Sequence, residues 1–160
     1  MARARVGSPV ARFYQVAAAS SEGVMIGLLH KLVDQGLRVC LQVGDGARLR
    51  HLDDLLWRHP LERFLPHGVW DGPDPELQPV LLALRPDDRN GATVAIAADG
   101  KVIQGPLAFD VVVDFVLSAA PAPARERYRW YQAHGYALEY WIQSPEGRWS
   151  RAGGGDKTGQ

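Results

Sequence analysis

One predicted helix near the C-terminal end of the chain carries side chains that suit the binding of a charged ligand. Arg125 and Arg129 lie four residues apart, so their guanidinium groups project one helical turn apart on the same side as Tyr128 and Gln132. Arginine binds carboxylates bidentately, and a neighbouring aromatic ring shields such a contact from water. The pattern predicts a site for a short acidic peptide with an apolar anchor. The competing interpretation is a solvated arginine face, stabilised by pairs such as Glu126 with Arg129.

A second candidate surface is the proline-rich segment that follows a predicted helix ending near Trp57. Phe64 lies in this segment, between Pro60 and Pro66. If they are exposed together, Trp57, Phe64 and Pro66 form a docking site for a partner protein. The competing interpretation is that the two large aromatic side chains cover the core, as most such residues do.

The turn Gly44-Asp45-Gly46 follows a predicted strand and invites comparison with a phosphate loop. A dinucleotide fingerprint needs a third glycine, but Leu49 occupies that position. The turn also follows the second predicted strand, whereas the fingerprint follows the first. No Gly-x-x-x-x-Gly-Lys-Ser/Thr motif occurs, and residues 17–23 are not equipped to replace it. A tight strand-to-helix turn is the simpler interpretation, and a nucleotide-binding enzyme using this turn is kept as the alternative function.

The remaining polar residues indicate neither metal chemistry nor nucleophilic catalysis. The five histidines form no His-x-x-x-His pair, and His51 and His59 lie eight residues apart. Cys40 lies inside an apolar strand, where a thiol lacks the accessible, electropositive setting of a nucleophile, and no Gly-x-Ser-x-Gly elbow is present. Asp110 and Asp114 share a strand face, and solvation at the strand end or helix capping is their expected role. We therefore expect no catalytic residue, no metal and no cofactor.

The elements that must position these residues alternate between strands and helices. Strands are predicted at residues 10–16, 37–43, 80–84, 92–97, 109–116 and 136–142. Helices are predicted from a cap at Ser20–Glu22 to Gly36, from Asp45 or its neighbour to about Trp57, and over 121–135, with loops at 67–79 and 85–91. This order and the continuous apolar runs predict a three-layer α/β fold, in which a mostly parallel sheet carries helices on both faces.

The composition indicates one domain and argues against direct DNA coating. The 160 residues include 18 Lys+Arg, 18 Asp+Glu and 46% hydrophobic residues, which predicts an ordered core over about 10–151 and a flexible tail over 152–160. Residues 1–60, 61–120 and 121–160 carry +3, −5 and +2, so no basic surplus is available to coat a phosphate backbone. The single cysteine and the lack of a signal peptide or of about 18 consecutive apolar residues predict a cytoplasmic protein without a membrane partner.

Several separate motifs resemble, in order, those of one protein family. They are Leu56-Trp57 followed by Phe64–Gly68, then Gln78–Leu82, Asn90–Ala92, Val111–Phe115, and Ala124–Tyr128 followed by Gly135-Tyr136. Over about residues 10–150 the chain resembles the chi subunit of bacterial DNA polymerase III. It is most similar to the alphaproteobacterial branch, whose chains continue past the last helix with a Tyr-Trp pair and a further tryptophan, here Tyr140-Trp141 and Trp149.

The resemblance implies a nonenzymatic accessory subunit with a nucleotide-binding-like fold that has no working phosphate loop. In this family the arginine-bearing helix binds the acidic, phenylalanine-ended C-terminal tail of single-stranded-DNA-binding protein, and the matching positions are Arg125, Tyr128 and Arg129. Arg129 stands where lysine is common, and Gln132 stands where a further basic residue can occur. The resemblance therefore implies a link between that protein and the clamp loader during DNA replication, with single-stranded DNA reached only indirectly.

The region around Trp57, Phe64 and Pro66 resembles the family surface that docks the psi subunit. The same surface is an alternative site for a helicase-like repair partner or another clamp-loader element. The resemblance thus predicts an adaptor that acts in the cytoplasm at the replication fork and performs no chemistry of its own.

Overall fold

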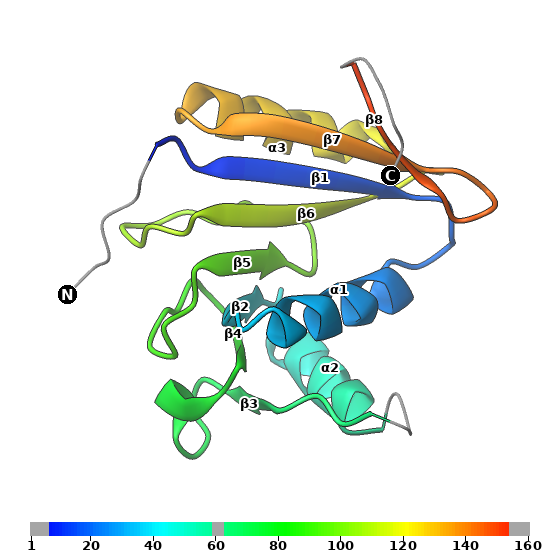
Figure 1. Cartoon of the computed structure of the whole chain (residues 1–160). Helices are drawn as coiled ribbons and strands as arrows, with labels where there is room; N and C mark the ends of the chain where they lie inside the picture. Colours follow the sequence, from blue (N-terminus) through cyan, green and yellow to red (C-terminus); the bar gives the residue numbers. More distant parts are fainter. Residues whose placement is uncertain (1–6, 59–62, 154–160) are drawn as a thin grey trace.

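In a computed structural model, which describes residues 7–58 and 63–153, eight strands form one mostly parallel sheet (Figure 1). Its order is β3-β4-β2-β5-β6-β1-β7-β8, and only β7 and β8 are antiparallel. The strands are β1 (Val10–Val16), β2 (Val39–Gln42), β3 (His67–Val69), β4 (Val80–Ala83), β5 (Val94–Ala97), β6 (Val111–Leu117), β7 (Ala137–Gln143) and β8 (Trp149–Arg151). The helices are α1 (Glu22–Asp34), α2 (Gly46–Arg58), the 3-10 turn η1 (Pro75–Leu77) and α3 (Ala122–Ala133).

Small residues with polar side chains begin α1 and α2, and a glycine ends α3, as predicted. The backbone N–H of Glu22 at the start of α1 donates to Ser20 Oγ at 3.2 Å. The N–H of Arg48 in the first turn of α2 donates to Asp45 Oδ1 at 2.9 Å, which satisfies a donor that has no partner within the helix. Gly135 follows α3 with φ +84°, a left-handed conformation that ends a helix at little cost for glycine. Among the described residues, none of these helices is long and apolar enough to cross a membrane.

The sheet separates two apolar cores, so the three-layer α/β prediction is confirmed. On one face, α1 and α2 bury leucines such as Leu29 and Leu52 against β2, β4 and β5. On the other face, α3 buries Ala124 and Tyr131 against Phe13 of β1 and its neighbours in β5 and β6. Figure 1 shows α1 and α2 beside the half of the sheet that ends in β3, and α3 beside β1 and β7.

Burial along the strands follows this division. Every residue of β2, β4 and β5 is buried, as expected for central parallel strands covered on both faces. In β1, the buried Ala11 and Phe13 alternate with the half-buried Arg12 and Tyr14, which lie on the opposite face. The sheet therefore presents Gln15, the next residue in the alternation, on the α3 side.

Two short elements correct the sequence prediction. Residues 67–79 were expected to form a loop, but they contain β3 and the 3-10 turn η1. The three residues of β3 include a glycine and form no apolar run, and it is pairing with β4, where His67 lies opposite Val80, that orders them. Strand β8 was not predicted either, because its order comes from antiparallel pairing of Trp149 with Gln143 across a turn.

Candidate functional site

Helix α3 contacts the sheet through residues that recur at helical spacing. Ala124 and Tyr131 are buried and Tyr128 is half-buried. The Tyr131 hydroxyl accepts a hydrogen bond from the backbone N–H of Ile103 at 2.7 Å, which fixes the C-terminal half of the helix to a loop of the sheet. The side chains left exposed on this helix include Arg125, Arg129 and Gln132.

A buried ion pair sets the rotation of α3. Arg127 donates from Nε to Asp114 Oδ2 at 2.7 Å and from NH2 to Asp114 Oδ1 at 2.8 Å. Burial raises the pKa of the Asp114 carboxyl, against the opposing effect of Arg127, whereas the hydrogen bonds to Asp114 raise the pKa of Arg127. Solvation at a strand end, the role expected for the Asp110 and Asp114 pair, is therefore wrong for Asp114, which is 1% exposed.

A groove of about 630 Å³ lies beside α3 and brings together most of the predicted binding residues. Residues from four segments line it, namely Gln15, Pro121, Ala124, Arg125, Tyr128, Arg129, Tyr140, Ala152 and Gly153. Arg125, Tyr128 and Arg129 are thus on one groove, as the sequence predicted. Gln132 is exposed but is not among the lining residues, so this part of the predicted site lies outside the groove.

Aromatic side chains form the apolar part of this groove. The Tyr128 ring lies 5.5 Å from that of Phe13 and 6.4 Å from that of Tyr140, measured between centroids. The Phe13 and Tyr140 rings stack at 6.0 Å with an interplanar angle of 8°. Tyr140 also donates its hydroxyl to Gln15 Oε1 at 2.6 Å. The groove therefore offers packed rings next to polar groups, rather than a uniformly charged surface.

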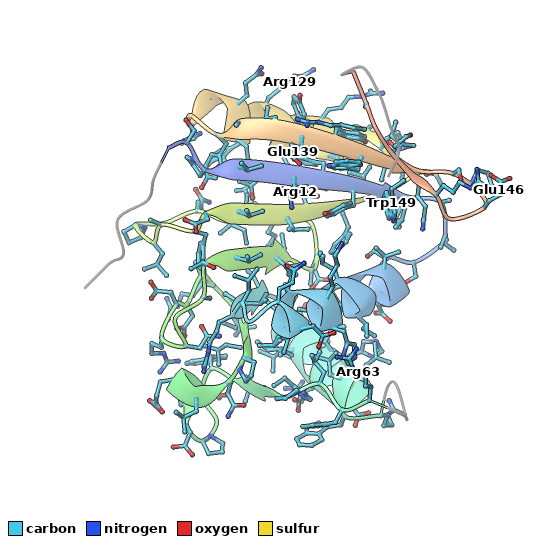
Figure 2. The ribbon with its side chains drawn as sticks, in the orientation of Figure 1. Arg12, Arg63, Arg129, Glu139, Glu146 and Trp149 are labelled. Carbon is cyan, nitrogen blue, oxygen red and sulfur yellow. The ribbon has the colours of Figure 1, made fainter. Side chains whose placement is uncertain are left out.

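The two arginines at the rim of the groove have no anionic partner within the described part of the chain. Arg125 and Arg129 are exposed, and neither forms an ion pair with a described residue. Glu126 does not pair with Arg129 in this structure, so the competing interpretation of a salt-bridged helix face lacks its proposed contact. Figure 2 shows Arg129 projecting outward from α3. Both guanidinium groups are available to an external anion.

The second predicted surface is exposed at the end of α2. Trp57 and Phe64 are 59% and 57% exposed, and their ring centroids lie 5.3 Å apart. Pro66 is exposed beside them, whereas the buried His67 lies under Trp57 with a centroid distance of 4.9 Å. We call Trp57, Phe64 and Pro66 the aromatic patch. Pro60, the other bracketing proline, lies outside the described residues.

The glycine turn after β2 is occupied by the protein's own side chains. The Gly44 N–H, which would face a phosphate in a nucleotide-binding loop, donates to Asp99 Oδ2 at 2.8 Å. Arg48 NH2 lies 2.9 Å from Asp99 Oδ1, and Lys101 Nζ donates to the Gly44 carbonyl at 3.0 Å. A carboxylate therefore already fills the anion position at this turn, which favours the interpretation of a structural strand-to-helix turn.

The other candidates for chemistry also have structural surroundings. Cys40 is completely buried, and burial raises the pKa of its thiol to about 12, so it is the inert core thiol that the sequence predicted. In the described part of the chain, no group of three or more His, Cys, Asp or Glu side chains is placed to hold a metal ion.

Sequence reasoning missed six of the nine residues that line the groove. Two of them belong to the segment of α3, and four come from other segments, namely Gln15, Tyr140, Ala152 and Gly153. Gln15 and Tyr140 come from strands that pair with each other in parallel, so their proximity depends on the register between β1 and β7. The alternation along β1 already placed Gln15 on the same face as Phe13, and this was the available signal. Ala152 and Gly153 follow β8, and their position depends on the turn before that strand.

Comparison with known proteins identifies the family of the chain. No curated protein matches the chain. The sequence model of the family described as DNA polymerase III chi subunit, HolC, matches residues 9–139, which include β1 to α3 and the start of β7. The match covers most of the chain and contains the arginine-bearing helix and the aromatic patch. The chain therefore belongs to the DNA polymerase III chi subunit (HolC) family and has an accessory role in DNA replication.

Proposed function

We propose that this chain is a non-catalytic subunit that binds the acidic C-terminal tail of single-stranded-DNA-binding protein in the groove beside α3 and thereby links that protein to the clamp loader. The observation that carries the proposal is the pair of unpartnered arginines, Arg125 and Arg129, beside the Tyr128 and Tyr140 rings. Carboxylates of the tail pair with the guanidinium groups, and an apolar side chain packs on the rings. The proposed site of action is the replication fork in the cytoplasm.

An acidic peptide fits this site better than a nucleic acid does. The whole chain is formally neutral, and the groove brings only two unpartnered cations next to its aromatic rings. Binding to a phosphate backbone would need a longer basic surface, because its affinity grows with the number of phosphates neutralised. Single-stranded DNA is therefore reached through the partner.

The aromatic patch supports a second proposed contact. Trp57 and Phe64 are more than half exposed and contact each other, an arrangement that is common at the centre of protein interfaces. We propose that this patch docks the psi subunit, another clamp-loader element or a helicase-like repair partner. The groove and the patch lie at opposite ends of the sheet, so one chain has separate surfaces for two partners (Figure 1).

The first experiment measures the affinity of the groove for its proposed ligand. A labelled acidic peptide that ends in phenylalanine is titrated with the protein by fluorescence anisotropy, and micromolar binding that weakens with salt is expected. Arg129→Ala should weaken binding about tenfold, since loss of a central arginine costs on the order of 1–2 kcal/mol. Arg50→Ala is the matched control, because Arg50 is exposed on α2, across the sheet from α3.

If the Arg129→Ala variant binds the acidic peptide with unchanged affinity, the assigned binding site is wrong. Thermal denaturation with ATP, GTP or NAD tests the alternative of a nucleotide-binding enzyme, because a ligand that binds the folded state raises Tm by mass action. The contacts of Asp99 with Gly44 predict no shift. A nucleotide-dependent increase in Tm would favour the enzyme instead.

A further inference from the structure

The groove has a wall that is formed outside the segment shared with the family. The family match ends at residue 139, whereas β8 and the two residues after it lie beyond that point. The turn before β8 is closed by the Ser144 N–H, which donates to the Arg148 carbonyl at 2.7 Å. After β8, the Ala152 N–H donates to the Tyr140 carbonyl at 2.8 Å. This bond holds Ala152 and Gly153 against the groove, facing the arginines of α3.

The floor of the groove offers a donor that has no partner among the described residues. Gln15 accepts the Tyr140 hydroxyl proton through Oε1 at 2.6 Å, and no described residue bonds to its Nε2. Burial raises the pKa of the Tyr140 phenol, so the hydroxyl remains a donor and keeps the amide of Gln15 oriented. An amide fixed in this way presents an N–H group to a ligand in the same groove as Arg125 and Arg129.

We infer that the acidic segment bound in this groove lies between α3 and the residues that follow β8, with Gln15 donating a hydrogen bond to one of its carboxylates. The inference rests on the proposed function, because it assigns further contacts to the same ligand. Ala152 is then a residue that limits what fits beside the arginines, and Gln15 is a binding residue that carries no charge. Both extend the site beyond the helix from which it was predicted.

Introducing a negative or a positive charge at Ala152 tests whether the bound segment lies beside this residue. Ala152 is exposed, so a longer side chain is tolerated there. Ala152→Glu should weaken peptide binding and Ala152→Lys should tighten it, each by about fivefold, since unit charges about 4 Å apart in water interact by about 1 kcal/mol. Ala47→Glu and Ala47→Lys are the controls, because Ala47 is exposed on α2 and gives the same change in net charge. Equal peptide affinities for the Glu and Lys variants of Ala152 would show that the bound segment does not lie beside this residue.

Two substitutions of Gln15 test whether its side chain donates a hydrogen bond to the ligand. Gln15→Leu removes the donor and should weaken binding about tenfold, the cost of one hydrogen bond to a charged group. Gln15→Glu has nearly the same shape and can still accept from Tyr140, but it repels a carboxylate and should weaken binding further. Tm is measured for both, because a purely structural role would lower Tm without a specific change in affinity. Peptide affinity of Gln15→Leu within twofold of wild type would overturn the assignment.

The two proposals fail in different ways. If Arg129→Ala leaves the peptide affinity unchanged, the proposed function itself is wrong. If Arg129→Ala weakens binding but the variants of Ala152 and Gln15 behave like the Ala47 controls, the ligand lies on α3 alone and only the present inference is overturned.

Discussion

The two halves of the sheet are stabilised in different ways. In the half formed by β3, β4, β2 and β5, the central strands are buried throughout, and α1 and α2 pack on them through leucines such as Leu52 and Leu56. In the half formed by β6, β1, β7 and β8, ionised side chains pair with each other across neighbouring elements, among them Asp114 with Arg127. Buried polar side chains also occur in the first half, where Asn90 donates to two backbone carbonyls. We call these the apolar half and the polar half. Hydrogen bonds fix direction as well as distance, so the side-chain pairs of the polar half orient the elements around the groove.

The surfaces of the two halves also differ, since one is mainly apolar and the other carries oriented polar groups. The aromatic patch lies on the apolar half and presents two rings without a fixed polar contact of their own. The groove lies on the polar half, where the Tyr140 hydroxyl orients Gln15 and the Arg127 pair orients α3. The patch is therefore suited to a partner that is recognised by shape and apolar area, and the groove to one that is recognised by charge and direction.

The buried ion pair gives the largest expected effect. Asp114→Asn leaves the half-buried Arg127 guanidinium without its anion, so the free energy of unfolding should fall by about 3–5 kcal/mol. Asp54→Asn is the control on the apolar half, because its pair with Arg58 is exposed and should contribute about 0.5 kcal/mol or less. Urea unfolding measures both. Similar losses in the two variants would mean that the halves are not stabilised differently.

A half-buried ion pair on the other face of the polar half gives a smaller effect that depends on pH. Arg12 Nε donates to Glu139 Oε1 at 2.8 Å, across β1 and β7 (Figure 2). Burial raises the pKa of Glu139, but hydrogen bonds from Arg12 and Trp141 outweigh it and hold the pKa below its ordinary value of 4.5. The unfolded chain therefore binds this proton at higher pH than the folded chain does, and the stabilisation is present above about pH 4.5 and lost below it.

The Glu139→Gln variant tests this direction of the pH dependence. The variant should be less stable than wild type by about 1 kcal/mol or less at pH 7, and the difference should narrow as the pH falls from about 5 to 3. Glu146→Gln is the control, since Glu146 is exposed in the turn before β8. A difference that stays constant with pH would show that the Glu139 carboxylate does not stabilise the polar half.

The aromatic patch gives the smallest expected effect on stability. Trp57→Ala combined with Phe64→Ala should change the free energy of unfolding by about 1 kcal/mol or less, because both side chains are more than half exposed. The acidic peptide should bind the double variant with wild-type affinity, while capture of clamp-loader or helicase partners in a pull-down should be lost. Weaker peptide binding in this variant would couple the two surfaces and contradict their separation.

Much of the fold was predictable because its signals are local. The central strands are continuous apolar runs, and Ser20, Asp45 and Gly135 mark helix ends through their own backbone contacts or conformation. Ala124 and Tyr131 lie seven residues apart, a spacing that puts both on one side of a helix, and both are buried. For the same reason Arg125, Tyr128 and Arg129 could be assigned to one surface, since residues at positions i, i+3 and i+4 lie on one side of a helix without any tertiary information.

The parts that were missed depend on contacts between distant segments. Arg127 lies two residues from each groove arginine, so helical spacing places it on a different side of α3, but that spacing does not identify its partner, Asp114 of β6. Strand β3 has three residues and no apolar run, so its pairing with β4 is what defines it. Gln15 and Tyr140 reach the groove through the register of β1 with β7, which no pattern within either strand specifies.

The contact of Asp99 with the Gly44 amide has a consequence for how the protein is regulated. A loop whose amide awaits a phosphate changes its shape with the supply of nucleotide, whereas this turn is completed by a side chain of the same molecule. Its conformation is therefore independent of the energy state of the cell. On the proposed function, this turn gives the connection between the partners no nucleotide-dependent state, and any timing in the assembly comes from the partners themselves.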